Sequence, residues 1–241
     1  MRAVVFAYSN VGDRCLRLLH ARGVEVALVV THRDTPGEML WFERVADTAA
    51  ELSLPTVLVE DLSSAELAQA VERARPDVIF SFYFRSMIPT ALLSLAPGGA
   101  FNMHGSLLPH FRGRAPTNWA VLKGATETGA TLHEMVAKPD AGFIVDQSAV
   151  PILPDDTAEQ VFDKVTVAAD VADEAAVCDL ARAGLDTVAI RVPGHPLGAR
   201  ADPTHAGADL QWLLPRHSGR CVCGPGGRPA PHARQPAGPG A

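Results

Sequence analysis

Short apolar runs alternate with longer amphipathic stretches along the first 105 residues of the chain. Apolar runs bounded by turn residues are typical of buried strands, whereas apolar positions three and four residues apart are typical of helices. The predicted strands cover residues 3–8, 24–30, 55–60, 77–84 and 100–105, and the predicted helices cover 9–23, 41–53, 61–75 and 89–99. Strands that alternate with helices build a parallel sheet covered on both faces. The pattern therefore predicts an α/β fold with a doubly wound, mainly parallel sheet.

The pattern changes after this alternation. Residues 128–136 and 142–152 alternate apolar and polar positions, which predicts a β-hairpin joined through the sequence AKPDAG. A helix with an acidic start is predicted over residues 155–172. From residue 173 the periodicity weakens. We therefore expect one domain, large enough for a catalytic domain, over residues 1–172 and a divergent or truncated region over residues 173–241.

The last 51 residues, from 191 onward, hold 18 of the 39 glycines and prolines of the chain and no Lys, Glu, Ile or Phe. A segment this poor in core-forming residues is predicted to be an irregular, disordered tail. Two origins stay open: a natural flexible tail, or a stretch translated out of the ancestral reading frame, because GC-rich codons give Gly, Pro, Arg and Ala in any frame. Sequencing the source gene tests the second origin, which requires a homologous continuation in a shifted frame.

Composition narrows the function classes. The net charge of −6 disfavours a chain whose main task is binding nucleic-acid phosphates, so a small-molecule ligand is expected. No apolar run has the length of a membrane span, and the first residues lack a secretory leader, which predicts a cytoplasmic protein without membrane insertion. The first strand-to-helix turn, AYSNVGDRC, has one Gly in place of the G-x-G-x-x-G fingerprint, so no dinucleotide cofactor is predicted.

The four cysteines are scattered along the chain and predict reduced thiols: Cys15, Cys178, Cys221 and Cys223. Cys221 and Cys223 are separated by one residue and lie near His217 and His232 in the sequence. Zinc sites of this kind need a two-residue gap and a second cysteine pair. No metal site is therefore predicted.

Candidate chemistry lies at the end of the fifth predicted strand, in the stretch FNMHGSLLPHFRGRAPTNW (101–119), of which the part after the strand is expected to be irregular. Asn102 and His104 are two residues apart, so both side chains project from one face of the strand, at its carboxyl end, where α/β sheets bind ligands. A His can transfer a proton, and an amide N–H can stabilise an oxyanion. Asp140, in the predicted hairpin turn, is the best-placed carboxylate. Taken singly, a structural His and a turn-forming Asp remain the alternatives.

The residues Asn102 to Pro109, followed by Arg112 and Gly113, resemble the N-x-H-x-S-L-L-P-x-x-R-G signature of the formyltransferases that use N10-formyltetrahydrofolate. The resemblance covers residues 1 to about 170 and implies a Rossmann-like formyltransferase core. It is closest to the branch that formylates UDP-4-amino-4-deoxy-L-arabinose in lipid A modification and polymyxin resistance. The segments FAY, DTPGE, PDVIFSFYFR, HGSLLPHFRGRAPTNW and ETGATLHEMV carry this closer resemblance.

The resemblance implies a reaction and a set of residues. Asn102 matches the Asn that stabilises the transition state, His104 the proton-transferring His, and Asp140 the Asp that raises its basicity. The implied folate contacts are Ser86, Met87, Ile88, Arg114, Val136, Ala137, Lys138, Pro139 and Asp140. The co-substrates implied are N10-formyltetrahydrofolate and a UDP-linked amino-sugar, with no metal and no nucleic acid.

Two alternatives to this function are kept. Methionyl-tRNA formyltransferases share the core signature, but a tRNA substrate favours a basic surface and a folded C-terminal module, neither of which this sequence shows. The second alternative is a degenerate, non-catalytic folate-binding fragment, because the small C-terminal domain of the family is not recognisable after residue 172. The sequence does not determine the oligomeric state.

Overall fold

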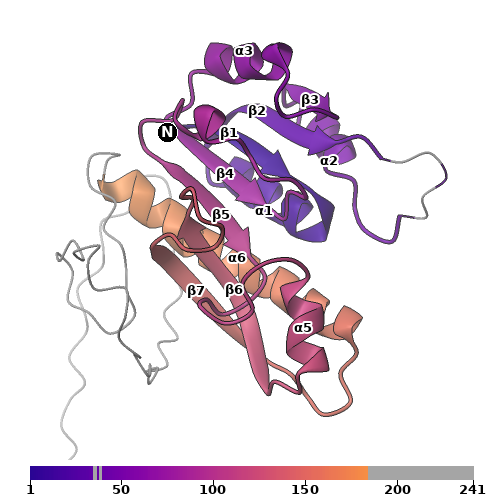
Figure 1. The fold of residues 1–241 in the computed structure, drawn as a ribbon. Helices are drawn as coiled ribbons and strands as arrows, with labels where there is room; N and C mark the ends of the chain where they lie inside the picture. The colour runs from indigo at the N-terminus through magenta and orange to yellow at the C-terminus, as the bar shows by residue number, and fades with distance from the viewer. Residues whose placement is uncertain (35–36, 38–39, 184–241) are drawn as a thin grey trace, which may run out of the picture.

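A computed structural model describes residues 1–34, 37 and 40–183 of the chain. Seven strands form one sheet in the order β3-β2-β1-β4-β5-β6-β7. The strands are β1 (Arg2–Ala7), β2 (Glu25–His32), β3 (Thr56–Val59), β4 (Val78–Phe82), β5 (Ala100–His104), β6 (Glu127–Glu134) and β7 (Ile144–Pro151). The helices are α1 (Ser9–Ala21), α2 (Val45–Glu51), α3 (Ala65–Ala74), α4 (Thr90–Leu93), α5 (Pro116–Leu122) and α6 (Ala158–Ala183). Figure 1 shows the sheet running from β3 at one edge to β7 at the other.

The strand directions confirm the predicted fold class. Strands β1 to β5 are parallel to their neighbours, because a helical segment connects each to the next, whereas β6 and β7 extend the sheet antiparallel as a hairpin. The chain moves from β3 at the edge back to β4 beside β1, so the order of connection reverses between β1 and β4. This reversal is the point at which open α/β sheets bind ligands.

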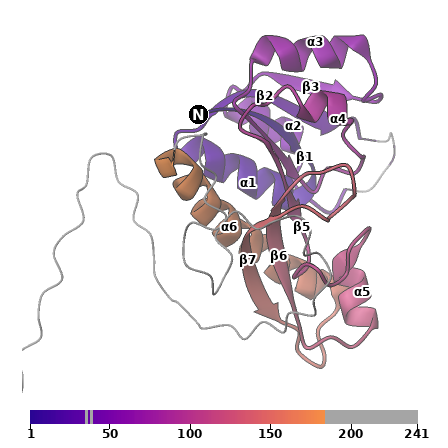
Figure 2. The same cartoon turned by 60° about the vertical axis from the view of Figure 1, so that its left-hand side comes forward.

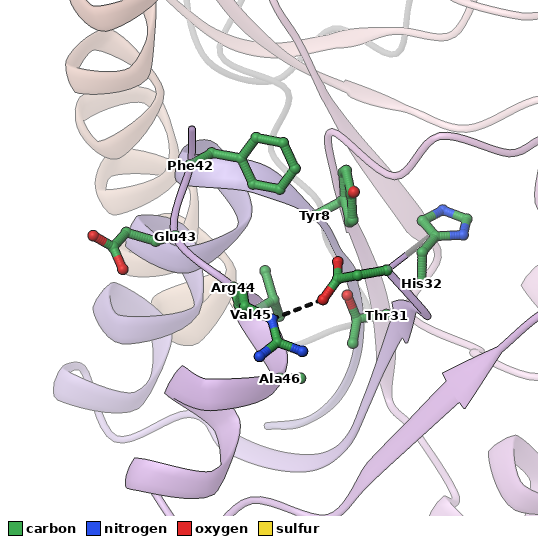
Figure 3. A pocket seen from close by; sticks show the side chains of 9 residues that line it. Tyr8, Thr31, His32, Phe42, Glu43, Arg44, Val45 and Ala46 are labelled. Carbon is green, nitrogen blue, oxygen red and sulfur yellow. Dashed lines mark hydrogen bonds and ion pairs between the residues drawn. The ribbon is translucent and has the colours of Figure 1, made fainter. Parts of the chain in front are cut away.

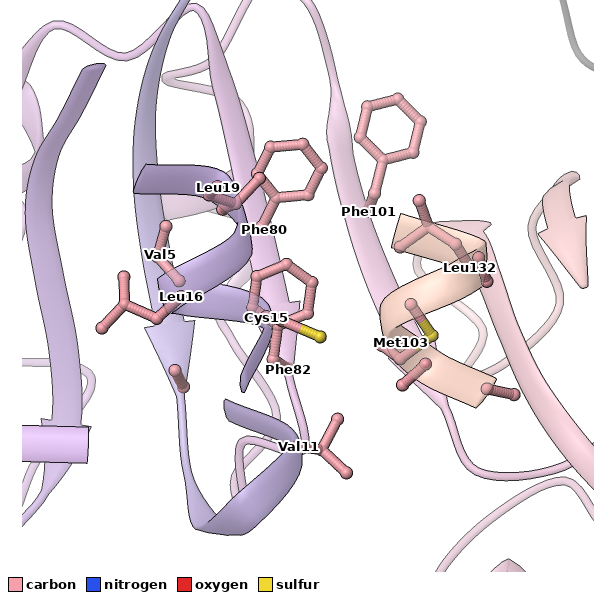
Figure 4. Close-up of a cluster of buried hydrophobic side chains, with 14 of the residues drawn as sticks. Val5, Val11, Cys15, Leu16, Leu19, Phe80, Phe82, Phe101, Met103 and Leu132 are labelled. Carbon is pink, nitrogen blue, oxygen red and sulfur yellow. The ribbon is translucent and has the colours of Figure 1, made fainter. Parts of the chain in front are cut away.

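Alternating side chains of the central strands enter two cores, one on each face of the sheet. Val5 of β1 and Phe80 of β4 pack with α1, α2 and α6 on one face, while the adjacent Val4 and Ile79 pack with α3 and α4 on the other. Figure 4 shows the first core, in which Leu19 of α1 lies beside Phe80 of β4 and Leu16 lies on the side of Val5 of β1. Burial on both faces explains why these strands read as continuous apolar runs.

Helix α6 covers the sheet beside α1, as Figures 1 and 2 show. Val161 and Val165 of α6 are fully buried in the first core, and α6 packs on β6 and β7. The guanidinium of Arg14 on α1 donates from Nε to Asp170 of α6 at 2.8 Å, which ties the two helices together. The helix predicted over residues 155–172 thus continues to Ala183.

The stretch 101–119 is more regular than expected. The sequence prediction of an irregular segment is wrong for its last residues, because α5 begins at Pro116. Proline at the first turn of a helix costs no hydrogen bond and has the helical φ, and Ala115 before it adopts φ 51° to turn the chain into the helix. Helix α2 is shorter than the predicted 41–53 and begins at Val45.

The predicted tail from residue 191 and the Cys221 and Cys223 pair lie outside the described residues. Among the helices that the structure does describe, none combines the length and apolar character of a membrane span.

Candidate active site

Asn102 and His104 lie on β5, and their side chains point to the sheet face opposite α1 and α6. Phe101 and Met103, which alternate with them along β5, fill the core under those two helices, which leaves Asn102 and His104 on the other face, as the two-residue spacing predicted. In the parallel register Ala7 of β1 is level with Phe82 of β4, and Phe82 is level with Met103 of β5. The carboxyl ends of β1, β4 and β5 therefore form one edge, with His104 on it.

His133, which the sequence analysis did not identify, completes the polar face. Strand β6 pairs antiparallel with β5 so that Asn102 lies opposite His133. Asn102 Nδ2 donates to His133 Nε2 at 3.2 Å, and His133 Nδ1 donates to the carbonyl of Glu134 at 2.8 Å. The sequence shows only that Thr131 and His133 share one face of a strand, and the register that places His133 opposite Asn102 comes from the structure.

Asp140 projects from the β6–β7 turn to a point between the two histidines. Its Oδ1 lies 3.6 Å from His104 Nδ1 and 3.6 Å from His133 Nε2, and its Oδ2 accepts the backbone N–H of Gly113 at 2.8 Å. The expected proximity of Asp140 to His104 is thus present in the structure. Burial opposes ionisation of this carboxyl, but the neighbouring rings of His133 and His104 and the Gly113 N–H outweigh it and lower the pKa of Asp140 to about 2.

His104 is 6% exposed, and both ring nitrogens have defined neighbours. Nε2 donates to the carbonyl of Phe111 at 3.0 Å, which leaves the Nδ1 lone pair on the side of Asp140. Burial lowers the pKa of His104 below 6.5, although the Phe111 carbonyl and the Asp140 charge both favour the protonated ring. At neutral pH the ring is therefore an uncharged base, and the imidazolium formed by proton uptake would face a carboxylate.

These opposing influences predict a titration that NMR can measure. We expect the pKa of His104 to lie below 6.5, and we expect Asp140→Asn to lower it further, because the variant removes a charge that favours the imidazolium. Since the ring binds its proton more weakly in the folded state, the His104 contribution to stability is present above pH 6.5 and is lost as pH falls through the lowered pKa. The measurement is the ring ¹³C chemical shift of His104 against pH, assigned with His104→Gln; a higher pKa in Asp140→Asn would contradict it.

The turn that carries Asp140 depends on Gly142. A Cβ at this position would lie 1.9 Å from the carbonyl oxygen of Glu134. The two strands of the hairpin approach closely here, because the Glu134 N–H donates to the Phe143 carbonyl at 2.8 Å. Asp140 itself adopts φ 51°, a left-handed conformation that the closed turn must hold.

We expect Gly142→Ala to open this turn, to lower the free energy of unfolding by about 1–3 kcal/mol and to reduce activity, because Asp140 moves away from His104. Urea unfolding and kcat measure the two effects. Gly124→Ala is the control: a Cβ at Gly124 meets no atom within 4 Å, so this substitution strains only its own positive-φ backbone and causes no clash. Equal effects of the two substitutions on activity would show that the Gly142 contact does not position Asp140.

The residues predicted to bind folate differ in how far their side chains are exposed. Ser86 and Met87 follow β4 and are exposed, and the Met87 side chain is 66% exposed. Ile88, by contrast, is buried in the core beside α3 and α4, so its side chain anchors the loop after β4 to that core. Arg114 and residues 136–139 are exposed, with Asp140 alone turned inward from that run.

A hollow lies at the carboxyl ends of β1 and β2, beside the same edge of the sheet (Figure 3). Tyr8, His32 and Phe42 line it, and the ion pair of Arg44 Nε with Asp34 Oδ2 at 2.7 Å crosses it. The His32 ring stacks on Phe84 with centroids 4.0 Å apart, and Arg85 covers the Tyr8 ring at 5.0 Å. No group of three or more His, Cys, Asp or Glu side chains in the described ranges is arranged to hold a metal ion.

Known proteins share this fold. A family profile described as formyl transferase matches residues 1–173. Among solved structures, phosphoribosylglycinamide formyltransferase from Anaplasma phagocytophilum is 25% identical, with a TM-score of 0.64, and the match covers 76% of this chain and 87% of that one. Glycinamide ribonucleotide transformylase 1 from Geobacillus kaustophilus is 26% identical with a TM-score of 0.60, over 70% of this chain and 93% of that one.

An N-formyltransferase from Helicobacter canadensis, solved in complex with folinic acid and dTDP-3-aminofucose, has the same fold. It is 20% identical with a TM-score of 0.60, and the match covers 76% of this chain and 65% of that one.

Proposed function

Because the chain belongs to the formyl transferase family and is a formyltransferase, we propose that it transfers a formyl group from N10-formyltetrahydrofolate to the primary amine of a nucleotide-linked amino-sugar, with UDP-4-amino-4-deoxy-L-arabinose as the first candidate acceptor. The observation that carries the proposal is the group of Asn102, His104 and Asp140 at the carboxyl edge of the sheet. Acyl transfer to an amine needs an oxyanion donor and a base, and this group supplies both.

The oxyanion would be stabilised by Asn102. Attack of the amine on the formyl carbon gives a tetrahedral species with negative charge on oxygen. The Asn102 amide has two N–H groups, of which one is donated to His133 and holds the side chain in place. The other N–H is free to donate to the developing oxyanion, without reorganisation at the moment of reaction.

His104 would move the proton. The attacking nitrogen becomes positively charged and must lose a proton, while the folate nitrogen that leaves must gain one. A neutral, buried imidazole with a free lone pair can do both in turn, and Asp140, ionised because its pKa is about 2, stabilises the intermediate imidazolium. Proton transfer of this kind needs no covalent bond between enzyme and substrate.

The donor would lie against the exposed apolar residues around the site. Met87 after β4 and Val136 after β6 are 66% and 39% exposed, although apolar side chains of this size are usually buried. A flat pterin and its aromatic ring would cover such surface, and Arg114 is exposed for a folate carboxylate. The Helicobacter canadensis enzyme was solved with folinic acid, which supports this class of donor.

The acceptor side carries features that suit a phosphate-bearing substrate. The N-terminus of α1 has no side-chain cap, and the Ser9 hydroxyl beside it is buried without a hydrogen-bond partner. Helix N-termini with free N–H groups bind phosphates. β1 and β5 are separated by β4 alone, so this anion site and His104 lie about 10 Å apart, a span that a sugar linked to a diphosphate can bridge. The bound dTDP-3-aminofucose of the Helicobacter canadensis enzyme agrees with this acceptor class.

Phosphoribosylglycinamide is a second candidate acceptor, because it also joins a phosphate to a primary amine and because proteins that formylate it share the fold at 25% identity. The test is tetrahydrofolate release from N10-formyltetrahydrofolate with each acceptor: UDP-4-amino-4-deoxy-L-arabinose, dTDP-3-aminofucose, phosphoribosylglycinamide and initiator tRNA. Turnover with a sugar nucleotide alone supports the proposal. Turnover with phosphoribosylglycinamide alone or with tRNA alone would identify that molecule as the acceptor in place of a sugar nucleotide. A folded protein that a folate analogue stabilises, but that turns over none of these acceptors, would be a folate binder without this activity.

A further inference from the structure

The loop of residues 106–111 carries the carbonyl that binds His104, and it is held in an unfavourable backbone conformation. Phe111, whose carbonyl accepts the His104 Nε2–H at 3.0 Å, has φ 55°, a left-handed value that a bulky aromatic residue rarely adopts. Such conformations persist only where the surroundings fix them. The contacts that fix this loop should therefore be identifiable in the structure.

Thr131 of β6 is the centre of those contacts. Its side chain is fully buried and lies opposite His104 in the strand register. Its hydroxyl donates to the Ser106 carbonyl at 2.6 Å and accepts the Leu108 N–H at 3.1 Å. Gln147 Nε2 donates to the same hydroxyl at 2.8 Å. One donated and two accepted hydrogen bonds use every site of a hydroxyl group, so the oxygen has one arrangement that satisfies it.

Gln147 of β7 and Ser106 extend the network along the loop. The second Nε2–H of Gln147 is donated to the Leu108 carbonyl at 2.9 Å. The buried Ser106 hydroxyl donates to the His110 carbonyl at 2.6 Å, directly before Phe111. The loop is thus bound at the carbonyls of residues 106, 108 and 110, and its next carbonyl, that of Phe111, binds His104.

We propose that Thr131 and Gln147 are positioning residues for formyl transfer: they hold the 106–111 loop so that the Phe111 carbonyl keeps the His104 proton on Nε2 and the base lone pair on Nδ1, beside Asp140. The proposal rests on the proposed role of His104 as the base. A loop freed from this network would relax the strained Phe111 backbone, withdraw the carbonyl and let the His104 ring rotate or change tautomer. Neither residue needs to touch a substrate for its loss to impair proton transfer.

The test compares Thr131→Val, which keeps the side-chain shape but removes the hydroxyl, with Thr131→Ser, which keeps the hydroxyl. We expect Thr131→Val to lower kcat about 10–100-fold with little change in KM, since proton transfer by a positioned group contributes about 10²–10⁴-fold. The kcat of Thr131→Ser should stay within about threefold of the kcat of the natural chain. Gln147→Leu, altered at a partly buried site, should lower kcat in the same direction and serves as the second variant if Thr131→Val does not fold.

A readout independent of turnover separates this proposal from the proposed function. Long-range ¹H–¹⁵N NMR of the ring shows which nitrogen of His104 carries the proton, and it needs no substrate. The natural chain and Thr131→Ser should show the proton on Nε2, and a folded Thr131→Val or Gln147→Leu should show a mixture of tautomers. An unchanged Nε2 signal together with unchanged kcat in the folded variants would overturn the positioning role. If the natural chain transfers no formyl group but the folded variants still show mixed tautomers of His104, the proposed reaction is wrong and the positioning of His104 by this network stands.

Discussion

His104→Ala is expected to lower kcat for formyl transfer by about 10²–10⁴-fold, the range that a positioned acid–base group contributes. The variant removes the base that accepts the proton of the attacking amine and the acid that returns it to the folate nitrogen. The KM for the folate should change little, because the residues that would contact the donor follow β4 and β6 and remain in place. Initial rates of tetrahydrofolate release over a range of both substrates measure the two effects.

His104→Gln is the matched variant, because its side-chain amide can still donate to the Phe111 carbonyl but cannot act as a base. The two variants should be equally inactive, while His104→Gln should unfold at a temperature closer to that of the natural chain than His104→Ala. This difference separates the chemistry of the ring from its packing. Turnover retained in either variant would remove His104 from the mechanism and leave Asn102 and Asp140 without the base that the proposal needs.

The central strands of this protein could be predicted from the sequence because burial on both faces leaves few polar residues to interrupt them. The runs around Val4 and Val5, or Ile79 and Phe80, face two separate cores and therefore read as continuous apolar segments. Helix α5 was missed for the opposite reason. Its short stretch follows Gly and Arg residues that are typical of loops, and its first residue, Pro116, is common in turns as well as at helix starts, so packing against α6 and β6 decides in favour of the helix.

The candidate site could be predicted where one strand carries the signal, and could not where the site is made by pairing two strands. Asn102 and His104 are neighbours on β5, so their spacing places them on one face. His133 becomes the partner of Asn102 only through the register of β6 against β5, which sequence spacing within β6 does not fix. The strained φ of Phe111 and the network of Thr131 have no sequence signal at all, because both depend on where three segments meet.

Asn102→Ala is expected to lower kcat by about 10²–10³-fold, the loss seen when one oxyanion donor is removed from an acyl-transfer site. The variant removes the N–H that would stabilise the tetrahedral oxygen. It also removes the donor to His133 Nε2, so His133 is left with its single bond to the Glu134 carbonyl. Because the ground-state formyl group needs the amide less than the oxyanion does, the loss should appear in kcat more than in KM.

Two further variants separate these contributions. Asn102→Asp has nearly the same shape but replaces the N–H donor with a carboxylate near Asp140, so it should lose at least as much activity as Asn102→Ala. His133→Ala keeps the oxyanion donor but releases the side chain of Asn102 from its anchor. The loss in His133→Ala should therefore be smaller than in Asn102→Ala. If His133→Ala is instead the more damaging of the two, His133 and not Asn102 is the main electrostatic partner of the reacting group, and the role of Asn102 is to orient the ring.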